Sequence, residues 1–291
     1  MSLNSNIKNP LVSILMTAYN RQNYIAEAIE SVLSSTYTKF ELIIVDDGSK
    51  DRTVDIAREY EKTDSRIKVY VNEQNLGDYP NRNRAASYAT GEYIIYVDSD
   101  DKLLPDTITH ILADISIDSS FNFAMYWPHS EDTFKLSGNN ALQLHFFEKQ
   151  FLYIGPGGTF MRRSFFNSIG GYPEKYGPAN DMYFNLKVCC YTSILLLPYE
   201  FIFYRRHDGQ EINNSYNYIY NNYNYMRDAL NELSLPFTNN QYSWFKKKNK
   251  RRFVVNLFNY FIKTLNFKKT AEAYVKANFS FKDVFIGLFH F

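Results

Sequence analysis

The chain has 291 residues, 45% of them hydrophobic and 22% charged, with a formal net charge of +1, as is typical of a globular chain with one large domain, or one domain and an extension. It contains no run of ~18 apolar residues and no signal-peptide pattern at its start, so we expect neither a membrane-spanning helix nor export. Two adjacent cysteines, Cys189 and Cys190, exclude a disulfide framework and favour a reducing compartment.

Strands and helices are predicted to alternate over the first 115 residues. Short apolar runs predict strands at 11–16, 42–45 and 93–97, and alternation of apolar residues predicts a strand at 67–71. Apolar residues at helical spacing predict helices near 25–33, 54–60, 80–90 and 105–115. Ser49 is the expected cap of the second helix, and Pro105 fits the first position of the fourth. This alternation predicts an α/β fold, with a mostly parallel sheet flanked by helices.

The pattern is looser beyond residue 122. Strands are expected at 123–127, 160–162, 194–197 and 202–204, a loop at 155–158, and helices before Gly170-Gly171 and from Asp181 with Asn180 as its cap. From about residue 215 the chain is predicted to be helical, with a last helix over 270–291.

Three polar clusters follow predicted strands, at 17–20, 46–49 and 98–101. Ligands bind outside the carboxyl ends of such strands, so we expect the clusters to meet at one edge of one sheet. The Asp98-Ser99-Asp100-Asp101 cluster indicates either a hard divalent cation, Mn²⁺ or Mg²⁺, or simple capping of the following helix. Asp100 is the first candidate for metal contact, Asp98 would assist, and Asp101 would turn toward Lys102 or the helix.

The cluster at 46–49 has two interpretations that the residues alone leave open. It is either a turn with a capping serine, or a site where Asp47 accepts hydrogen bonds from a base or ribose.

Six motifs, in order and in spacing, resemble those of family 2 glycosyltransferases with the GT-A, Rossmann-like fold, as found in bacterial surface-polysaccharide assembly. They are Thr17-Ala18-Tyr19-Asn20, Asp46-Asp47-Gly48-Ser49-Lys50-Asp51, Asn75-Leu76-Gly77, Arg82-Asn83, Gly91-Glu92-Tyr93-Ile94 and Asp98-Ser99-Asp100-Asp101. The resemblance implies a catalytic domain over 1–211, with a nucleotide-binding part at about 11–108 and an acceptor part at about 122–211. A helical, basic and aromatic extension would follow over 212–291.

The resemblance implies an inverting hexosyl transfer from a nucleotide-sugar, usually a UDP-sugar, to an acceptor hydroxyl, with a divalent cation on the diphosphate. The implied nucleotide-binding residues are Thr17, Tyr19, Asn20, Asp47 (facing the uracil), Arg82, Asn83 and Asp98, and the implied metal ligands are Asp98, Asp100 and His207.

Inversion requires a general base for the acceptor hydroxyl. Asp181 matches the family's base, but Asn180 replaces the glutamate that the family usually places before it. Arg205 and Arg206 are candidate phosphate partners, and the 155–159 loop would face the acceptor. Alternatives of other classes are a non-catalytic nucleotide-sugar or glycan-binding protein and a sugar nucleotidyltransferase. The glycine-rich loop of a nucleotidyltransferase is absent after the first strand.

The carboxyl-terminal region differs in charge from the rest of the chain. Residues 212–291 hold 12 Lys/Arg and 4 Asp/Glu, whereas residues 1–211 hold 20 and 27. The basic run at 246–252 lies among aromatic residues, which indicates either a helix packed on the catalytic domain or attachment of 242–291 to an anionic membrane. We expect a cytoplasmic protein, peripheral on the inner face of the membrane if the second interpretation holds, with a lipid-linked or glycan acceptor. A homodimer contact is a further option, and nucleic acid is not an expected partner.

Overall fold

The computed structural model describes residues 9–116, 120–129, 131–208, 210 and 214–289. The chain divides into two compact units. The first comprises residues 1–138, 154–172 and 192–205, and the second comprises 139–153, 173–191 and 206–291. The start of the chain, where we expected no signal peptide, lies largely outside the described residues.

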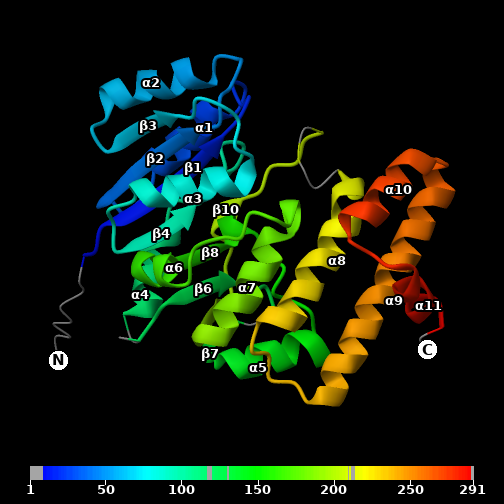
Figure 1. Cartoon of the computed structure of the whole chain (residues 1–291). Helices are drawn as coiled ribbons and strands as arrows, with labels where there is room; N and C mark the ends of the chain where they lie inside the picture. The colour runs from blue at the N-terminus through cyan, green and yellow to red at the C-terminus, as the bar shows by residue number, and fades with distance from the viewer. Residues whose placement is uncertain (1–8, 117–119, 130, 209, 211–213, 290–291) are drawn as a thin grey trace, which may run out of the picture. The chain divides into compact units, whose positions relative to one another are not determined.

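The first unit is built on a sheet that has eight strands in the described part of the chain (Figure 1). Its order is β3-β2-β1-β4-β8-β6-β9-β7, and β1 to β4 are mutually parallel. β8 runs antiparallel to both of its neighbours, and β7 runs antiparallel to β9. The strands are β1 (Val12–Ala18), β2 (Phe40–Asp46), β3 (Ile67–Val71), β4 (Tyr93–Tyr96), β6 (Phe123–Tyr126), β7 (Phe134–Leu136), β8 (Thr159–Arg162) and β9 (Ile194–Leu197).

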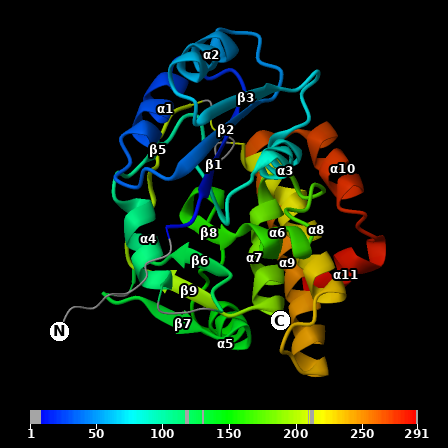
Figure 2. The same ribbon diagram turned by 90° about the vertical axis from the view of Figure 1, so that its left-hand side faces the viewer.

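Helices cover both faces of the parallel half of this sheet. The members are α1 (Ile25–Leu33), α2 (Thr53–Thr63), α3 (Asp78–Tyr88) and α4 (Thr107–Ile115). Apolar residues of α1, α2 and α4 join alternate residues of β1, β2 and β4 in one core. α3 contacts β1 and β2 from the other face, as Figure 2 shows. The predicted α/β fold is therefore confirmed, because each parallel strand returns through a helix.

Three smaller features complete the first unit. A two-stranded ladder joins β5 (Lys102–Leu103) to β10 (Ile202–Phe203). A short helix, α6 (Arg163–Ser168), follows β8. The predicted 155–158 loop contains one 3₁₀ turn, η2 (Pro156–Gly158).

The second unit is helical in the residues described. Its elements are α5 (Gly138–Gln143, beginning at the last residue of the first unit), a π-helical turn η1 (Leu144–Glu148), a 3₁₀ turn η3 (Gly177–Ala179), α7 (Asn180–Tyr191), α8 (Ser215–Glu232), α9 (Asn239–Thr264), α10 (Phe267–Lys276) and α11 (Phe281–Phe289). None of the described helices is both long enough and apolar enough to cross a membrane.

The tyrosine-rich helix α8 owes much of its packing to ring contacts within the second unit. Tyr223 lies 4.9 Å from Phe253 and 5.1 Å from Phe279, measured between ring centroids, and the two phenylalanines are 4.7 Å apart. Ile219 and Ala277 are buried in the same cluster. These aromatic side chains bury a large apolar area and so form a second core.

Three local predictions were wrong. α4 begins at Thr107, after Pro105. α2 begins at Thr53, whose backbone N–H donates to Asp51, and Ser49 bonds to Asp46 instead of capping the helix. The predicted helix over 270–291 is broken between α10 and α11, where Asn278 adopts a φ of 47°.

Candidate functional site

The loops after β1, β2 and β4 meet at one edge of the sheet. Ala18 pairs with Asp46 in the register of β1 and β2, and Leu15 pairs with Tyr96 in that of β1 and β4. The three strands are parallel and adjacent, so their carboxyl ends lie together. The predicted convergence of the three polar clusters is therefore confirmed by the sheet order.

Hydrogen bonds tie the first two loops to each other. The Asn20 backbone N–H donates to Ser49 Oγ at 2.8 Å, and the Lys50 N–H donates to Asn20 Oδ1 at 2.8 Å. Asn20 adopts a φ of 52°, a left-handed conformation that asparagine tolerates better than most residues. Tyr19, beside it, is 43% exposed, so its ring stands at the surface of the first unit.

Asp47 is a buried carboxylate that organises the loop after β3. Its Oδ1 accepts from Asn72 Nδ2 at 2.7 Å and from the Leu76 N–H at 2.8 Å, and its Oδ2 accepts from the Gly77 N–H at 2.8 Å. Gly77, with a φ of 92°, precedes α3. Asp47 thereby fixes the start of the helix that carries Arg82, and its expected contact with a base stays a prediction.

Arg82 is buried between two carboxylates. Its Nη1 and Nη2 donate to Oδ1 and Oδ2 of Asp98 at 2.7 and 2.9 Å, and its Nε lies 2.8 Å from Asp78 Oδ1. Burial by itself lowers the pKa of Arg82, but the charges of Asp78 and Asp98 outweigh it and raise that pKa well above its usual value. Thr17 Oγ1 also donates to Asp98 Oδ1, at 3.4 Å. A bidentate guanidinium–carboxylate contact of this kind holds the Asp98 carboxylate in one orientation.

Asp100 and Asp101 are held by arginines that sequence reasoning did not place there. Arg21 Nε donates to Asp100 Oδ2 at 2.9 Å. Arg205 donates through its backbone N–H to Asp101 Oδ1 and through Nε to the Asp100 carbonyl oxygen, both at 2.9 Å. Asp101 therefore faces Arg205, while Lys102 pairs with Glu27 at 2.6 Å. Neither arginine lies near the acidic turn in sequence, so no local signal could have identified them.

The acidic turn concentrates negative charge. Burial, together with the neighbouring charges of Asp98 and Asp100, raises the pKa of Asp101 to about 7, against the opposing effect of the hydrogen bond from the Arg205 backbone. The Asp101 carboxyl group therefore resists ionisation beside the carboxylates of its two neighbours. This is the electrostatic setting that a divalent cation would relieve.

Asp98 and Asp100 are the residues that could hold such a cation. Their side chains are 29% and 11% exposed, and carboxylate oxygens are the ligands that Mg²⁺ and Mn²⁺ prefer. Among the residues that the structure describes, no cluster of three or more His, Cys, Asp or Glu forms a full ligand set. Mg²⁺ commonly takes one or two carboxylates plus water and substrate phosphates. The pair therefore fits a cation that is bound together with a diphosphate.

Asn83, predicted to support the nucleotide, engages the backbone of Tyr172. Its Nδ2 donates to the Tyr172 carbonyl at 2.9 Å, and its Oδ1 accepts from the Tyr172 N–H at 3.0 Å. These bonds join α3 to the segment after α6 in the same unit. A nucleotide contact by Asn83 stays a prediction.

The predicted base and third metal ligand belong to the second unit. Asn180 is buried, its Oδ1 accepting from the Tyr176 N–H at 3.0 Å and its Nδ2 donating to the Gly177 carbonyl at 2.7 Å. Asp181, half-buried at the start of α7, accepts at Oδ1 from the Met182 N–H at 2.7 Å. The His207 backbone N–H donates to Gln210 Oε1 at 3.1 Å. α7 thus begins one residue earlier than predicted, with the Asn180 amide bonded to the preceding turn.

Fold and site together define a GT-A-type domain, in which a mixed sheet flanked by helices carries acidic loops at one edge. The chain belongs to glycosyl transferase family 2, because the model of that family matches residues 13–170, more than half of its length.

Curated relatives share the amino-terminal part of the chain. EpsH of Bacillus subtilis is 36% identical over 139 residues, which cover 48% of this chain and 40% of EpsH. TuaG of the same organism, described as a teichuronic acid biosynthesis protein, is 44% identical over 99 residues, covering 34% of this chain and 39% of TuaG. WfgD of Escherichia coli, a UDP-Glc:alpha-D-GlcNAc-diphosphoundecaprenol beta-1,3-glucosyltransferase, is 45% identical over 91 residues, covering 31% and 35%. Each match spans well under two thirds of the relative.

Solved structures share the fold over most of the chain. TarS of S. aureus in complex with UDP-GlcNAc has a TM-score of 0.70 and 21% identity, covering 90% of this chain and 79% of that one. The mannosyltransferase PcManGT of Pyrobaculum calidifontis, in complex with GDP-Man and Mn²⁺, has a TM-score of 0.63 and 15% identity, covering 92% and 80%. At sequence identities this low, the structural likeness shows a shared fold alone.

Proposed function

We propose that this chain transfers a sugar from a UDP-sugar to a hydroxyl of a glycan or lipid-linked acceptor, with inversion, in bacterial polysaccharide assembly. The observation that carries the proposal is the convergence of Thr17, Asp47 and the Asp98–Asp101 turn at the carboxyl edge of three adjacent parallel strands. The printed name of WfgD includes a UDP-sugar and a diphosphoundecaprenol acceptor, and a TarS structure contains UDP-GlcNAc, which supports this choice of donor and acceptor.

In this proposal Thr17, Tyr19 and Asp47 line the nucleoside pocket. Asp98 and Asp100 hold Mn²⁺ or Mg²⁺, with His207 as a further ligand. The cation, when bound, supplies Lewis acidity that stabilises the departing diphosphate. Arg82 holds the Asp98 carboxylate in one orientation, since Nη1 and Nη2 of Arg82 donate to its two oxygens. Arg205 and Arg21 fix the position of Asp100, since they donate to its carbonyl oxygen and to its carboxylate.

Asp181 is the proposed general base, which takes the proton from the acceptor hydroxyl as that oxygen attacks the anomeric carbon. Asn180, in the place of the customary glutamate, is bonded at both ends of its amide to the turn before α7. Its role is therefore to fix the start of α7, and we infer that the chemistry proceeds without a carboxylate at position 180.

Calorimetric titration of the chain with a panel of nucleotide sugars, with and without Mn²⁺ or Mg²⁺, tests the donor and the cation. We expect a UDP-sugar to bind only with the cation present, and Asp100→Ala to remove that binding and slow transfer about 1,000-fold. Asp55→Ala, which removes an exposed carboxylate on α2, is the matched control and should leave both unchanged. Full activity of Asp100→Ala would rule out its metal role.

Asp181→Asn separates binding from chemistry. The variant should bind the donor like the wild type but transfer sugar about 1,000-fold more slowly, because the amide cannot accept the proton. Turnover at the wild-type rate would require another base.

A non-catalytic nucleotide-sugar-binding protein is the second candidate, favoured only by the asparagine at position 180. Slow hydrolysis of the donor in the presence of Mn²⁺, lost in Asp100→Ala, is expected of the enzyme and not of a binding protein.

We also propose a cytoplasmic location, peripheral on the inner face of the membrane. The supporting feature is the basic and exposed apolar surface of α9 to α11, where an acceptor carried on a lipid would be accessible.

A further inference from the structure

The last three helices carry most of the exposed apolar side chains. Among the described residues, 17 large apolar side chains are exposed, and 11 of them lie between Trp244 and Phe289. On α9, Trp244, Val255, Phe258 and Ile262 are 45–62% exposed, and their spacing of three, four or eleven residues places them along one helix face. Single exposed apolar residues are ordinary, but a stripe of them indicates a surface that is covered in use.

α11 presents a second exposed row. Phe281, Phe285 and Phe289 are 73%, 53% and 68% exposed and contact one another ring to ring, at centroid distances of 5.4 and 5.9 Å. Gly287, on the buried side of the same helix, lies against Val254 and the Lys250 backbone of α9. α11 is therefore anchored on α9 by its small residue while its phenylalanines point outward.

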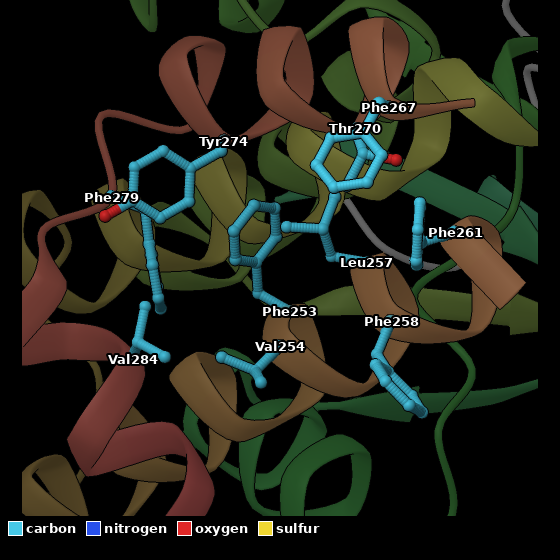
Figure 3. A pocket seen from close by; sticks show the side chains of 10 residues that line it. All are labelled: Phe253, Val254, Leu257, Phe258, Phe261, Phe267, Thr270, Tyr274, Phe279 and Val284. Atoms are coloured by element: carbon cyan, nitrogen blue, oxygen red, sulfur yellow. The ribbon is translucent and has the colours of Figure 1, made fainter. Parts of the chain in front are cut away.

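A cavity of about 250 Å³ opens between these helices (Figure 3). Its walls come from α9, α10 and α11 and the turn before α11, all within the second unit: Phe253, Val254, Leu257, Phe258, Phe261, Phe267, Thr270, Tyr274, Phe279 and Val284. An apolar cavity of about 150 Å³ already accepts a benzene molecule. This larger one therefore has room for a length of hydrocarbon chain.

The cavity is apolar and opens at the exposed surface. Phe258 and Phe267 line it while being 62% and 76% exposed, so they stand at its mouth. Thr270 Oγ1 donates to the Asn266 carbonyl of its own helix at 2.8 Å, which leaves its methyl group for the wall. Sugar or nucleotide groups would lose hydrogen bonds in such a site, whereas methylene groups would lose none.

The charge around the cavity selects among the apolar partners. Residues 239–289 contain 11 Lys/Arg and 2 Asp/Glu, and Lys263 and Lys268 are exposed beside Ile262 and Phe267. A second copy would bring an equally positive surface against this one, which opposes association. An anionic lipid surface complements both the charge and the apolar stripe, and each basic residue near such a surface adds to the attraction.

From these features we infer that the cavity between α9, α10 and α11 takes the hydrocarbon chain of an anionic membrane lipid, while Lys263 and Lys268 face the head groups. The inference rests on the proposed peripheral membrane association and deepens it, because it names a lipid-chain site instead of a general surface. It is independent of sugar transfer.

Two variants at one position test the cavity. Thr270→Phe fills it, whereas Thr270→Val keeps its volume. Decyl phosphate, titrated below its micelle concentration, should bind the wild type and Thr270→Val alike and Thr270→Phe about tenfold more weakly, since about 1.4 kcal/mol is a factor of ten. Inorganic phosphate alone should not bind. Equal affinities of Thr270→Phe and Thr270→Val for decyl phosphate would overturn the proposal that the cavity takes a hydrocarbon chain.

Vesicles test whether the bound hydrocarbon chain belongs to an anionic membrane lipid. Co-sedimentation with vesicles of phosphatidylglycerol and phosphatidylcholine should exceed that with phosphatidylcholine alone by about tenfold, and Lys263→Gln with Lys268→Gln should remove most of the difference. Equal binding to both vesicles, or a dimer in sedimentation that protects the same face without vesicle binding, would overturn the proposal.

Two measurements keep the test decisive. Hydrogen exchange of the wild type across 253–274 should slow when decyl phosphate is added, a result that needs no variant, and unchanged exchange would contradict the site. UDP-sugar binding by Thr270→Phe should match the wild type. If the wild type itself did not bind a UDP-sugar, that result would count against the proposed sugar transfer and not against the lipid site.

Discussion

The acidic edge of the first unit and the last helices of the second use opposite means of holding side chains in place. At the edge, Arg82 and Arg21 bond to carboxylates at 2.7 to 2.9 Å, and Asp47 accepts three hydrogen bonds. In α8 to α11, rings pack against rings, as between Phe253 and Phe279. Ion pairs fix the direction of each group, which suits a site that orients a charged ligand. Ring packing fills the interior of the helical unit but does not fix the direction of polar groups. The apolar side chains that stay exposed suit contact with an apolar partner.

The largest expected effect tests the aromatic side of this comparison on a single helix. Phe253 is 1% exposed and Phe258 is 62% exposed, five residues apart on α9. Phe253→Ala should lower the free energy of unfolding of the second unit by about 4 kcal/mol, because it leaves a cavity in the ring cluster. Phe258→Ala, the matched control, should change it by no more than about 0.5 kcal/mol.

Hydrogen exchange of α8 and α9 peptides measures this directly. Faster exchange in Phe253→Ala and unchanged exchange in Phe258→Ala are the expected results. Equal effects of the two variants would mean that the ring cluster is not the core of the second unit.

The next effect tests the ion-pair side. Arg82→Met should destabilise the first unit by about 3 kcal/mol, toward the lower end for breaking a buried pair, because Asp98 and Asp78 are 29% and 54% exposed and water can solvate them. The chain has two tryptophans. In a Trp244→Phe background, Trp127 alone reports the first unit, and urea titration of its fluorescence measures the change.

Arg84→Met is the control for this prediction, since Arg84 lies two residues along the same helix and pairs with neither carboxylate in any described contact. It should leave the urea midpoint close to that of the parent. If the two variants shift the midpoint equally, the buried ion pair does not stabilise the first unit.

The smallest of the three effects is a dependence on pH in the second unit. His145 is buried, and its Nδ1 accepts from the backbone N–H groups of Phe151 and Leu152 at 3.0 Å each. Burial lowers the pKa of His145 to about 4. The unfolded chain takes up the proton below its ordinary pKa of about 6.5 while the folded chain resists it, so stability is lost as the pH falls. Between pH 7 and pH 5 the loss should be about 2 kcal/mol.

Urea titrations of the wild type and His145→Asn at both pH values measure it. The asparagine Oδ1 can accept a bond in place of Nδ1 but does not titrate, so the variant should lose less stability between pH 7 and pH 5. A loss equal to that of the wild type would show that another group is responsible.

Much of the first unit could be predicted from the sequence. The alternating residues at 67–71 and the apolar run at 194–197 match β3 and β9 to the residue. A half-buried strand alternates apolar and polar side chains, whereas a fully buried strand requires continuous apolar ones. β7, over Phe134–Leu136, was not predicted. Its three residues are too few to establish a period, and only pairing with β9 makes it a strand.

The sequence by itself determined the fold class, the family and the meeting of three polar clusters at one edge, because the repeated strand–helix pattern makes the strands parallel and so puts their carboxyl ends at the same edge. Only the tertiary structure decided which groups hold those clusters. Arg21 lies 79 residues from Asp100, and Arg205 lies 104 residues from Asp101. Contacts over such separations leave no periodic trace in a sequence. The same holds for the cavity of α9 to α11, since helical spacing identifies an apolar face but not the neighbours that enclose it.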